Sequence, residues 1–113
     1  MHALSLLAVL LPLVAAKMHK QCDCWSFDTD KWEYNTGLTN YVCDQYYGGE
    51  HHLAVYDDGL GRCLSRDEKI DGAEWETLCK ISGQNGYYPI TPQGLIDLSG
   101  TKQYRNAVYG HCL

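Results

Sequence analysis

The chain has 113 residues, of which 45% are hydrophobic, and its 9 basic and 14 acidic side chains give a formal net charge of −5. The Lys and Arg residues are scattered singly, which excludes the clustered basic surface that nucleic acids require. The acidic balance also opposes attraction to anionic membranes, where cationic amphipathic faces are the rule. The length leaves room for one domain with a modest core.

The first sixteen residues have the pattern of a secretory signal peptide. The uncharged run over residues 3–14 is shorter than the roughly 20 residues that a membrane-spanning helix needs. The run ends in the small residues Ala15 and Ala16, which predicts cleavage after Ala16. We therefore expect residues 1–16 to be removed and residues 17–113 to form a single secreted, extracellular domain.

All six cysteines follow the predicted signal peptide, and an even number in a short exported chain predicts a disulfide framework. They are Cys22, Cys24, Cys43, Cys63, Cys79 and Cys112. Zinc is the alternative, but Cys22-x-Cys24 is the only close pair, whereas a zinc ribbon has two such knuckles. If Cys22 and Cys24 lie on one strand, two bridges could reach neighbours such as Cys63 and Cys112. Cys43 and Cys79 would then join the helices.

The first half of the predicted domain contains a strand, a helix and a hairpin. Residues 22–27 alternate in part and predict the strand, and residues 35–37 break it. Apolar residues at helical spacing predict a helix over 38–47, with Thr39 as the N-cap and Gly48-Gly49 as the stop. Residues 51–56 and 62–65 then predict a hairpin around the turn at 57–61.

The second half begins with the strongest local signal in the chain. Asp71-Gly72-Ala73-Glu74 is close to a capping box, which predicts a helix with Trp75 in the core and Gly83 as its end. Residues 83–106 predict a long irregular segment, and residues 107–112 a closing strand. The order is β-α-β-β-α-β. It predicts a small disulfide-stapled α+β sandwich of two layers, an antiparallel sheet with two helices on one face.

Five short motifs carry a family resemblance. They are Gln21-Cys-Asp-Cys24, the sequence LTNYVC over residues 38–43, Arg62-Cys63, IDGAEWETLC over residues 70–79, and Gly110-His-Cys112. Their spacing resembles that of the small secreted cysteine-rich proteins of ascomycete fungi. The resemblance covers most of residues 20–80 and the last three residues, and leaves residues 81–109 unmatched. The resemblance implies a candidate effector, and some such proteins share the β-α-β-β-α-β plan with fungal killer toxins. It implies no catalytic residues, so the cysteines alone carry over, as structural positions.

The aromatic composition favours amphipathic rings, with nine Tyr, three Trp and one Phe. Such rings suit recognition surfaces, and loops carry function more often than the scaffold does. Tyr87, Tyr88 and Tyr104 lie in or beside the long irregular segment, so we predict that they are exposed binding residues. Packing of these rings over a small core is the alternative.

Histidines are the candidates for catalysis. Glu50-His51-His52 together with His111 could supply an acid–base pair, as in secreted ribonucleases. This chemistry requires a histidine and a carboxylate to converge in a cleft, so we predict that the protein is not an enzyme.

Cleavage after Ala16 would leave Lys17-Met18-His19 at the amino terminus. The α-amine, two amide nitrogens and the imidazole can form a planar four-nitrogen site for Cu(II) or Ni(II). This sequence resembles the amino-terminal copper-binding motif of secreted proteins. The favoured alternative is a chance His in a disordered end, so we predict no metal or other cofactor.

Together these features predict a monomeric, exported protein that acts by binding. We expect a fungal virulence effector whose partner is a host or competitor protein or carbohydrate, outside or inside host cells, with no nucleic acid and no membrane span. The first alternative is a secreted toxin or antimicrobial protein. The second is a small secreted hydrolase resembling ribonucleases.

Overall fold

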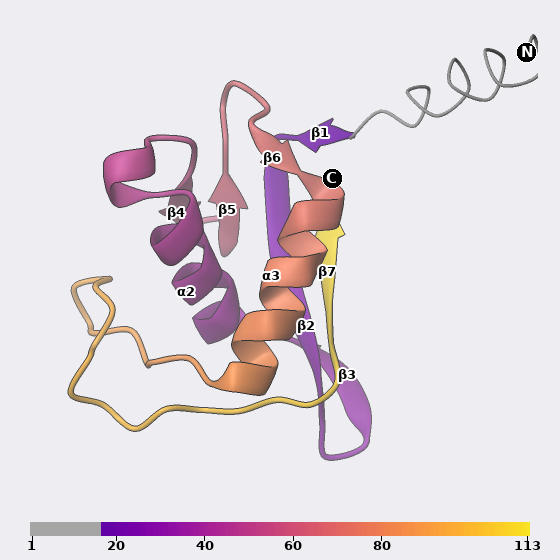
Figure 1. Ribbon diagram of the computed structural model, residues 1–113, viewed down its shortest axis with the longest axis vertical. Helices are drawn as coiled ribbons and strands as arrows, with labels where there is room; N and C mark the ends of the chain where they lie inside the picture. The colour runs from indigo at the N-terminus through magenta and orange to yellow at the C-terminus, as the bar shows by residue number, and fades with distance from the viewer. Residues whose placement is uncertain (1–16) are drawn as a thin grey trace, which may run out of the picture.

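Residues 17–113 are described by a computed structural model, in which an antiparallel sheet carries two helices on one of its faces (Figure 1). The expected signal peptide, residues 1–16, lies outside the described residues. The fold is therefore a small disulfide-stapled α+β sandwich, as the sequence predicts.

Strand β2 (Gln21–Asp28) is the centre of the sheet. Strand β7 (Val108–Cys112) pairs with it along one edge. The opposite edge is shared by β5 (Arg62–Leu64), which pairs with the first half of β2, and β3 (Lys31–Tyr34), which pairs with the second half. Strand β4 (Val55–Asp57) pairs with β5 and completes the predicted hairpin.

Four elements do not occur in the predicted β-α-β-β-α-β order. Strand β3 follows β2 as a hairpin, because residues 29 and 30 turn the chain with positive φ angles. The short strands β1 (Met18–His19) and β6 (Ile70–Asp71) form a separate two-stranded sheet. A single 3-10 turn, η2 (Gly49–His51), follows the first helix.

Helix α2 (Thr36–Tyr46) begins earlier than predicted. Its N-cap is Asn35, whose side-chain oxygen accepts the amide of Leu38 at 2.8 Å. The predicted cap, Thr39, lies inside the helix. Its hydroxyl accepts the Cys24 amide at 2.9 Å and donates to the Asn35 carbonyl at 2.7 Å, so it fixes the helix to the sheet.

Helix α3 (Gly72–Asn85) begins at the predicted cap and ends later than predicted. The Asp71 carboxylate accepts the amides of Ala73 and Glu74 at 3.0 and 3.3 Å, which confirms the cap. Gly83 does not stop the helix, because it is buried against β7, where a Cβ would lie 2.7 Å from Val108 Cγ2. The chain leaves the helix at Gly86, with φ of +96°.

The core lies between the helices and the inner face of the sheet. Its largest fully buried side chains include Trp75, Tyr47, Tyr87, Leu38, Ile70 and Val42. Trp75 is in the core as predicted, and its indole N–H donates to the Asp23 carbonyl at 2.8 Å. None of the helices in residues 17–113 combines the length and the apolar character needed to cross a membrane.

Three disulfides connect the layers, and no cysteine of the described residues is free. They are Cys22–Cys112, Cys24–Cys79 and Cys43–Cys63. The expectation that Cys112 pairs with the Cys22/Cys24 strand is correct. The expected bridge from that strand to Cys63 and the Cys43–Cys79 bridge between the helices are both wrong. The cysteine of each helix lies on its buried stripe, which faces the sheet, so each helix is bonded to a strand beneath it.

Residues 86–107 form the predicted irregular segment. Two isolated bridges order it, between Tyr87 and Gln103 and between Ile90 and Ile96. The segment crosses the end of the two helices before it enters β7 (Figure 1).

Candidate binding face

The outer face of the sheet, opposite the helices, carries the most distinctive group of side chains in the described residues. Along β2, Cys24 and Ser26 point toward the helices and are buried. Because side chains alternate along a strand, Asp23, Trp25 and Phe27 point to the other face. Figure 1 shows both helices on one side of the sheet.

Five aromatic rings gather on this outer face, and we call them the aromatic face: Trp25, Phe27, Trp32, Tyr34 and Tyr109. The strand register brings them together, because Trp25 is opposite Tyr34 on β3 and Tyr109 on β7, and Phe27 is opposite Trp32. Trp25 and Tyr109 are parallel, with ring centroids 6.0 Å apart, and Trp32 meets Tyr109 edge-on at 4.9 Å. Trp32 remains 43% and Phe27 47% exposed, so the rings offer apolar surface to a partner.

A buried carboxylate adjoins the aromatic face. The Asp23 side chain is 1% exposed. Its Oδ1 accepts the indole N–H of Trp25 at 2.8 Å, and its Oδ2 accepts the Nε–H of Arg62 at 2.8 Å. His111 Nδ1 lies 3.3 Å from Oδ1. One carboxylate thus orients an indole, a guanidinium and an imidazole.

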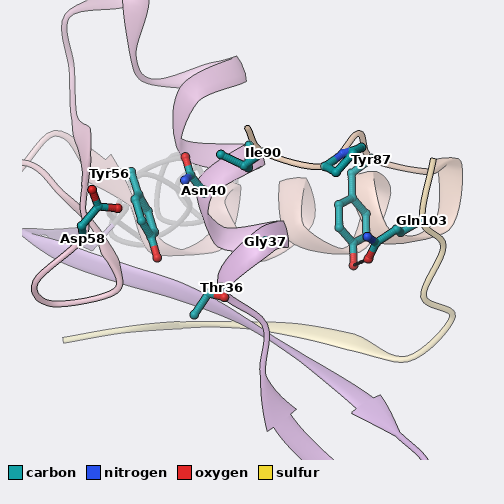
Figure 2. A pocket seen from close by; sticks show the side chains of 9 residues that line it. Thr36, Gly37, Asn40, Tyr56, Asp58, Tyr87, Ile90 and Gln103 are labelled. Atoms are coloured by element: carbon teal, nitrogen blue, oxygen red, sulfur yellow. Dashed lines mark hydrogen bonds between the residues drawn. The ribbon is translucent and has the colours of Figure 1, made fainter. Parts of the chain in front are cut away.

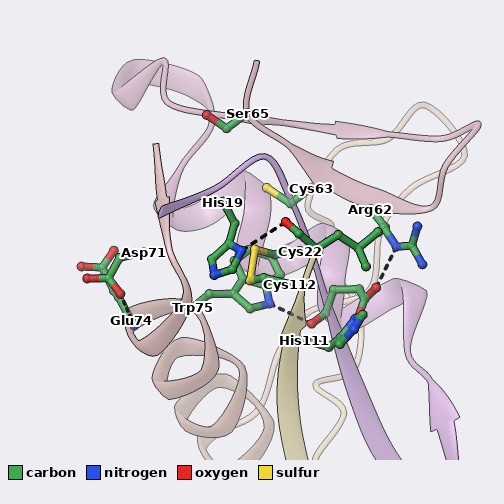
Figure 3. Close-up of a disulfide and its surroundings, with 12 residues drawn as sticks. His19, Cys22, Arg62, Cys63, Ser65, Asp71, Glu74, Trp75, His111 and Cys112 are labelled. Atoms are coloured by element: carbon green, nitrogen blue, oxygen red, sulfur yellow. Dashed lines mark hydrogen bonds and ion pairs between the residues drawn. A yellow bond between two sulfur atoms is a disulfide. The ribbon is translucent and has the colours of Figure 1, made fainter. Parts of the chain in front are cut away.

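The Arg62 and His111 side chains are the accessible part of this cluster, with 30% and 44% of their surface exposed. Figure 3 shows them converging beside the Cys22–Cys112 disulfide, Arg62 from β5 and His111 from β7. Burial and the Asp23 charge raise the pKa of the nearby Tyr34 hydroxyl to about 12, so this phenol stays neutral.

The predicted binding tyrosines have different environments. Tyr87 is not exposed, because it is 1% accessible and its hydroxyl accepts a hydrogen bond from the N-cap residue Asn35 at 3.0 Å. Tyr88 is half-buried, and Lys102 Nζ lies 5.3 Å from its ring centroid. Tyr104 is 57% exposed, as predicted. The three residues therefore do not form one exposed surface.

The candidate catalytic histidines do not come together. His51 and His52 lie at the turn η2 beside α2, whereas His111 lies on β7, beyond the other edge of β2. His111 alone meets a carboxylate, that of Asp23, which the sequence did not indicate as its partner.

The predicted copper-binding residues are part of the folded domain. Met18 and His19 pair with β6, the Lys17 carbonyl accepts the amide of Gly72, and His19 Nδ1 lies 3.1 Å from the Leu113 carbonyl. A copper site there depends on cleavage after Ala16 and stays a prediction. Within residues 17–113, no group of three or more His, Cys, Asp or Glu side chains is arranged to hold a metal ion.

Comparison with known proteins found no significant match to a family model, a curated protein or a solved structure.

Proposed function

We propose that this chain is an exported protein that acts by binding a macromolecule of a host or neighbouring organism, as fungal effectors do. Its contact surface is the aromatic face together with Arg62 and His111. One observation carries the proposal: five rings lie on the sheet face opposite the helices, beside a buried carboxylate that orients an arginine. Trp, Tyr and Arg are the residues that most often dominate binding energy at protein interfaces.

The three disulfides support export, because such bonds persist in oxidising compartments and stabilise small domains there. A partner protein suits the face better than an anionic membrane does, since the chain carries a net charge of −5. The same net charge argues against the alternative of a membrane-active toxin.

Trp32→Ala tests the contact surface. This ring lies on the outer face and is 43% exposed, so its removal should preserve the fold and weaken binding at least tenfold. Tyr104→Ala is the matched control, because it removes a ring that is 57% exposed on the irregular segment. The mature domain and both variants serve as baits in extracts of the colonised host, and any captured protein is then purified and its affinity measured. Equal affinities for the mature domain and Trp32→Ala would reject the aromatic face as the contact.

The timing of production tests the biological role. An effector should be produced much more strongly during host colonisation than in pure culture. Induction by a competing microbe instead would favour the antimicrobial alternative.

The Asp23–His111 contact supports a second candidate function, a hydrolase resembling ribonucleases. The Asp23 carboxylate lies 3.3 Å from His111 Nδ1, so it can favour the tautomer that leaves Nε2 free as a general base, and Arg62 could stabilise an anionic transition state. His111→Ala should abolish RNA or ester hydrolysis if this function is real. Absence of such activity in the folded protein would reject the enzyme and leave binding.

A further inference from the structure

A second candidate site lies where β1 meets the end of β7. It is a cavity of about 390 Å³, a volume in the range of small-molecule sites. Its lining includes Lys17, His19, Lys20, Glu68 and Cys112. Cys112 is bonded to Cys22, and Figure 3 shows the His19 ring beside this disulfide. The cavity therefore places a ligand-sized space next to a sulfur–sulfur bond.

The Cys22–Cys112 bond differs from the other two disulfides in its exposure. Cys112 is partly exposed, whereas Cys22 and the four cysteines of the other two bonds are 0% exposed. Thiol–disulfide exchange begins when a thiolate attacks one of the two sulfurs, so its rate depends on access. Cys112 is the half of the bond that borders the cavity. In the folded protein we therefore expect exchange at this bond and not at the two buried ones.

The cavity is positively charged, although the whole chain has a net charge of −5. Lys17 and Lys20 line it together with one acid, Glu68. Glu68 Oε1 lies 3.8 Å from Lys20 Nζ, and Lys17 forms no ion pair within residues 17–113. One cationic charge is thus left over beside Cys112. Such a charge attracts anionic reactants and stabilises a thiolate at the reacting sulfurs.

A cavity of similar volume, about 380 Å³, shows that size alone does not select this chemistry. It lies at the first turns of α2, and Figure 2 shows Thr36, Tyr56 and Asp58 among its walls. Among the described residues, no cysteine and no Lys, Arg or His lines it. Charge and an accessible sulfur therefore distinguish the cavity at Cys112.

Strand β7 does not depend on the Cys22–Cys112 bond for its position. Five residue pairs join it to β2, and Gly110 lies against α3, where a Cβ would be 2.6 Å from the Glu76 Cα. The other two disulfides still bond each helix to a strand. A free Cys22 thiol behaves as a small hydrophobic group, which suits its buried position. Opening this one bond should leave the domain folded, whereas loss of all three should unfold it.

We propose that Cys112 is a site of reversible modification by a small anionic thiol of the glutathione class. The incoming thiolate attacks the Cys112 sulfur, a bond forms between these two sulfurs, and the Cys22–Cys112 bond breaks. Cys22 leaves as a thiolate and takes a proton from water. The product is a mixed disulfide on Cys112, and attack of the Cys22 thiolate on Cys112 restores the original bond and releases the thiol. The exchange conserves the number of disulfides, so it needs no further oxidant or reductant.

Incubation of the folded protein with reduced glutathione tests the site. After acid quenching and alkylation, peptide mass spectrometry should find glutathione on Cys112 and a free thiol at Cys22, with the other four cysteines still bonded. The near-ultraviolet circular dichroism should remain native. Adducts at another cysteine, loss of all three bonds together, or no adduct at all would each overturn the proposal.

Lys17→Glu tests the part played by the cavity. It reverses the unpaired charge beside Cys112, so exchange with glutathione at low ionic strength should slow at least fivefold. Lys31→Glu makes the same charge change at the β2–β3 hairpin and should alter the rate less than twofold. The uncharged thiol 2-mercaptoethanol should be slowed much less by Lys17→Glu, which controls for access to the sulfur.

Equal effects of Lys17→Glu and Lys31→Glu would reject the cavity as the site of attack. The proposal does not depend on binding through the aromatic face. Trp32→Ala should leave glutathione exchange unchanged, so failure here is distinguishable from failure of the proposed function.

Discussion

Two arginine–aspartate pairs in this protein have the same separation and different burial, which allows the buried pair to be tested against an internal control. In each pair an arginine Nε lies 2.8 Å from a carboxylate oxygen. Asp23 is 1% exposed, whereas Asp28 is 28% exposed, and the two arginines, Arg62 and Arg105, are similarly accessible at 30% and 32%. Only Arg62 is aligned to donate a hydrogen bond, because the Arg105 Nε–H has no acceptor in line.

The two pairs should therefore contribute clearly different amounts to the free energy of unfolding. Hydrogen bonds to charged groups contribute about 1.5–3 kcal/mol each, and Asp23 also accepts the Trp25 indole N–H. Removal of one partner from a buried pair costs about 3–5 kcal/mol, which we expect for Asp23→Ala and for Arg62→Ala. The coupling energy between Asp23 and Arg62 should be about 2–3 kcal/mol. For Asp28 and Arg105 it should be about 0.2–1 kcal/mol, the range of partly exposed ion pairs.

Two double-mutant cycles measure these couplings, each with two single Ala variants and the double variant. Urea unfolding with the disulfides intact gives the free energy of unfolding of each protein, and a constant m-value confirms that the same surface is exposed. Similar coupling energies in the two cycles would refute the argument that Asp23 organises the outer face through burial.

Four further outcomes are expected. Gly110→Ala should destabilise by about 3 kcal/mol, because its Cβ would lie 2.6 Å from the Glu76 Cα. Gly37→Ala in α2 should stabilise by about 0.5–1 kcal/mol, because its Cβ would meet only Asn35 Oδ1, at an ordinary contact distance of 3.7 Å; thermal melts compare the two variants. Trp75→Ala should cost about 3–5 kcal/mol in urea unfolding, and an unchanged stability would contradict its core position. The free energy of unfolding should fall as the pH rises from about 10 toward 12. Tyrosines of the unfolded chain ionise at about 10, whereas the pKa of Tyr34 in the fold is about 12. An absorbance titration shows whether the ionisation of Tyr34 accompanies unfolding. Thiol titration of the unfolded, unreduced protein should find no free thiol, and reduction should unfold the domain.

The elements that could be predicted from the sequence are those with strong local signals. The Asp71 cap predicted the start of α3, because a short carboxylate satisfies the first helical amides without help from distant residues. The Thr39 cap was wrong for the opposite reason: its hydroxyl binds β2, which is remote in sequence, and Asn35 takes the cap. Gly83 is a residue type that often ends a helix, but here it lies inside α3, where its lack of a side chain allows β7 to pack closely. Tertiary packing decided both positions.

The candidate face was missed because it depends on which strands pair, and only one of these pairings has a local signal. Lys31–Tyr34 alternates in the manner of a strand, and residues 28–30 form a turn before it, so the β2–β3 hairpin had a local signal. The contacts of Asp23 with Arg62 and His111 had no local signal. Arg62 is 39 residues from Asp23 in the sequence, and His111 lies at the end of the chain. The predicted exposure of Tyr87 was wrong for the same reason, because its hydroxyl binds Asn35, 52 residues away, whereas Tyr104 is exposed as predicted.

The Cys-x-Cys motif connects the stability of the domain to its outer face. Cys24 bonds to Cys79 on the inner side, and strand alternation then requires Asp23, next to it, to point outward. A slip of β2 by one residue would exchange the two faces and bury the aromatic rings beneath the helices. The bridges from Cys22 to β7 and from Cys24 to α3 prevent that slip. The disulfides thus fix which side chains face outward, and for this reason we expect reduction to abolish the proposed binding through the aromatic face along with the fold.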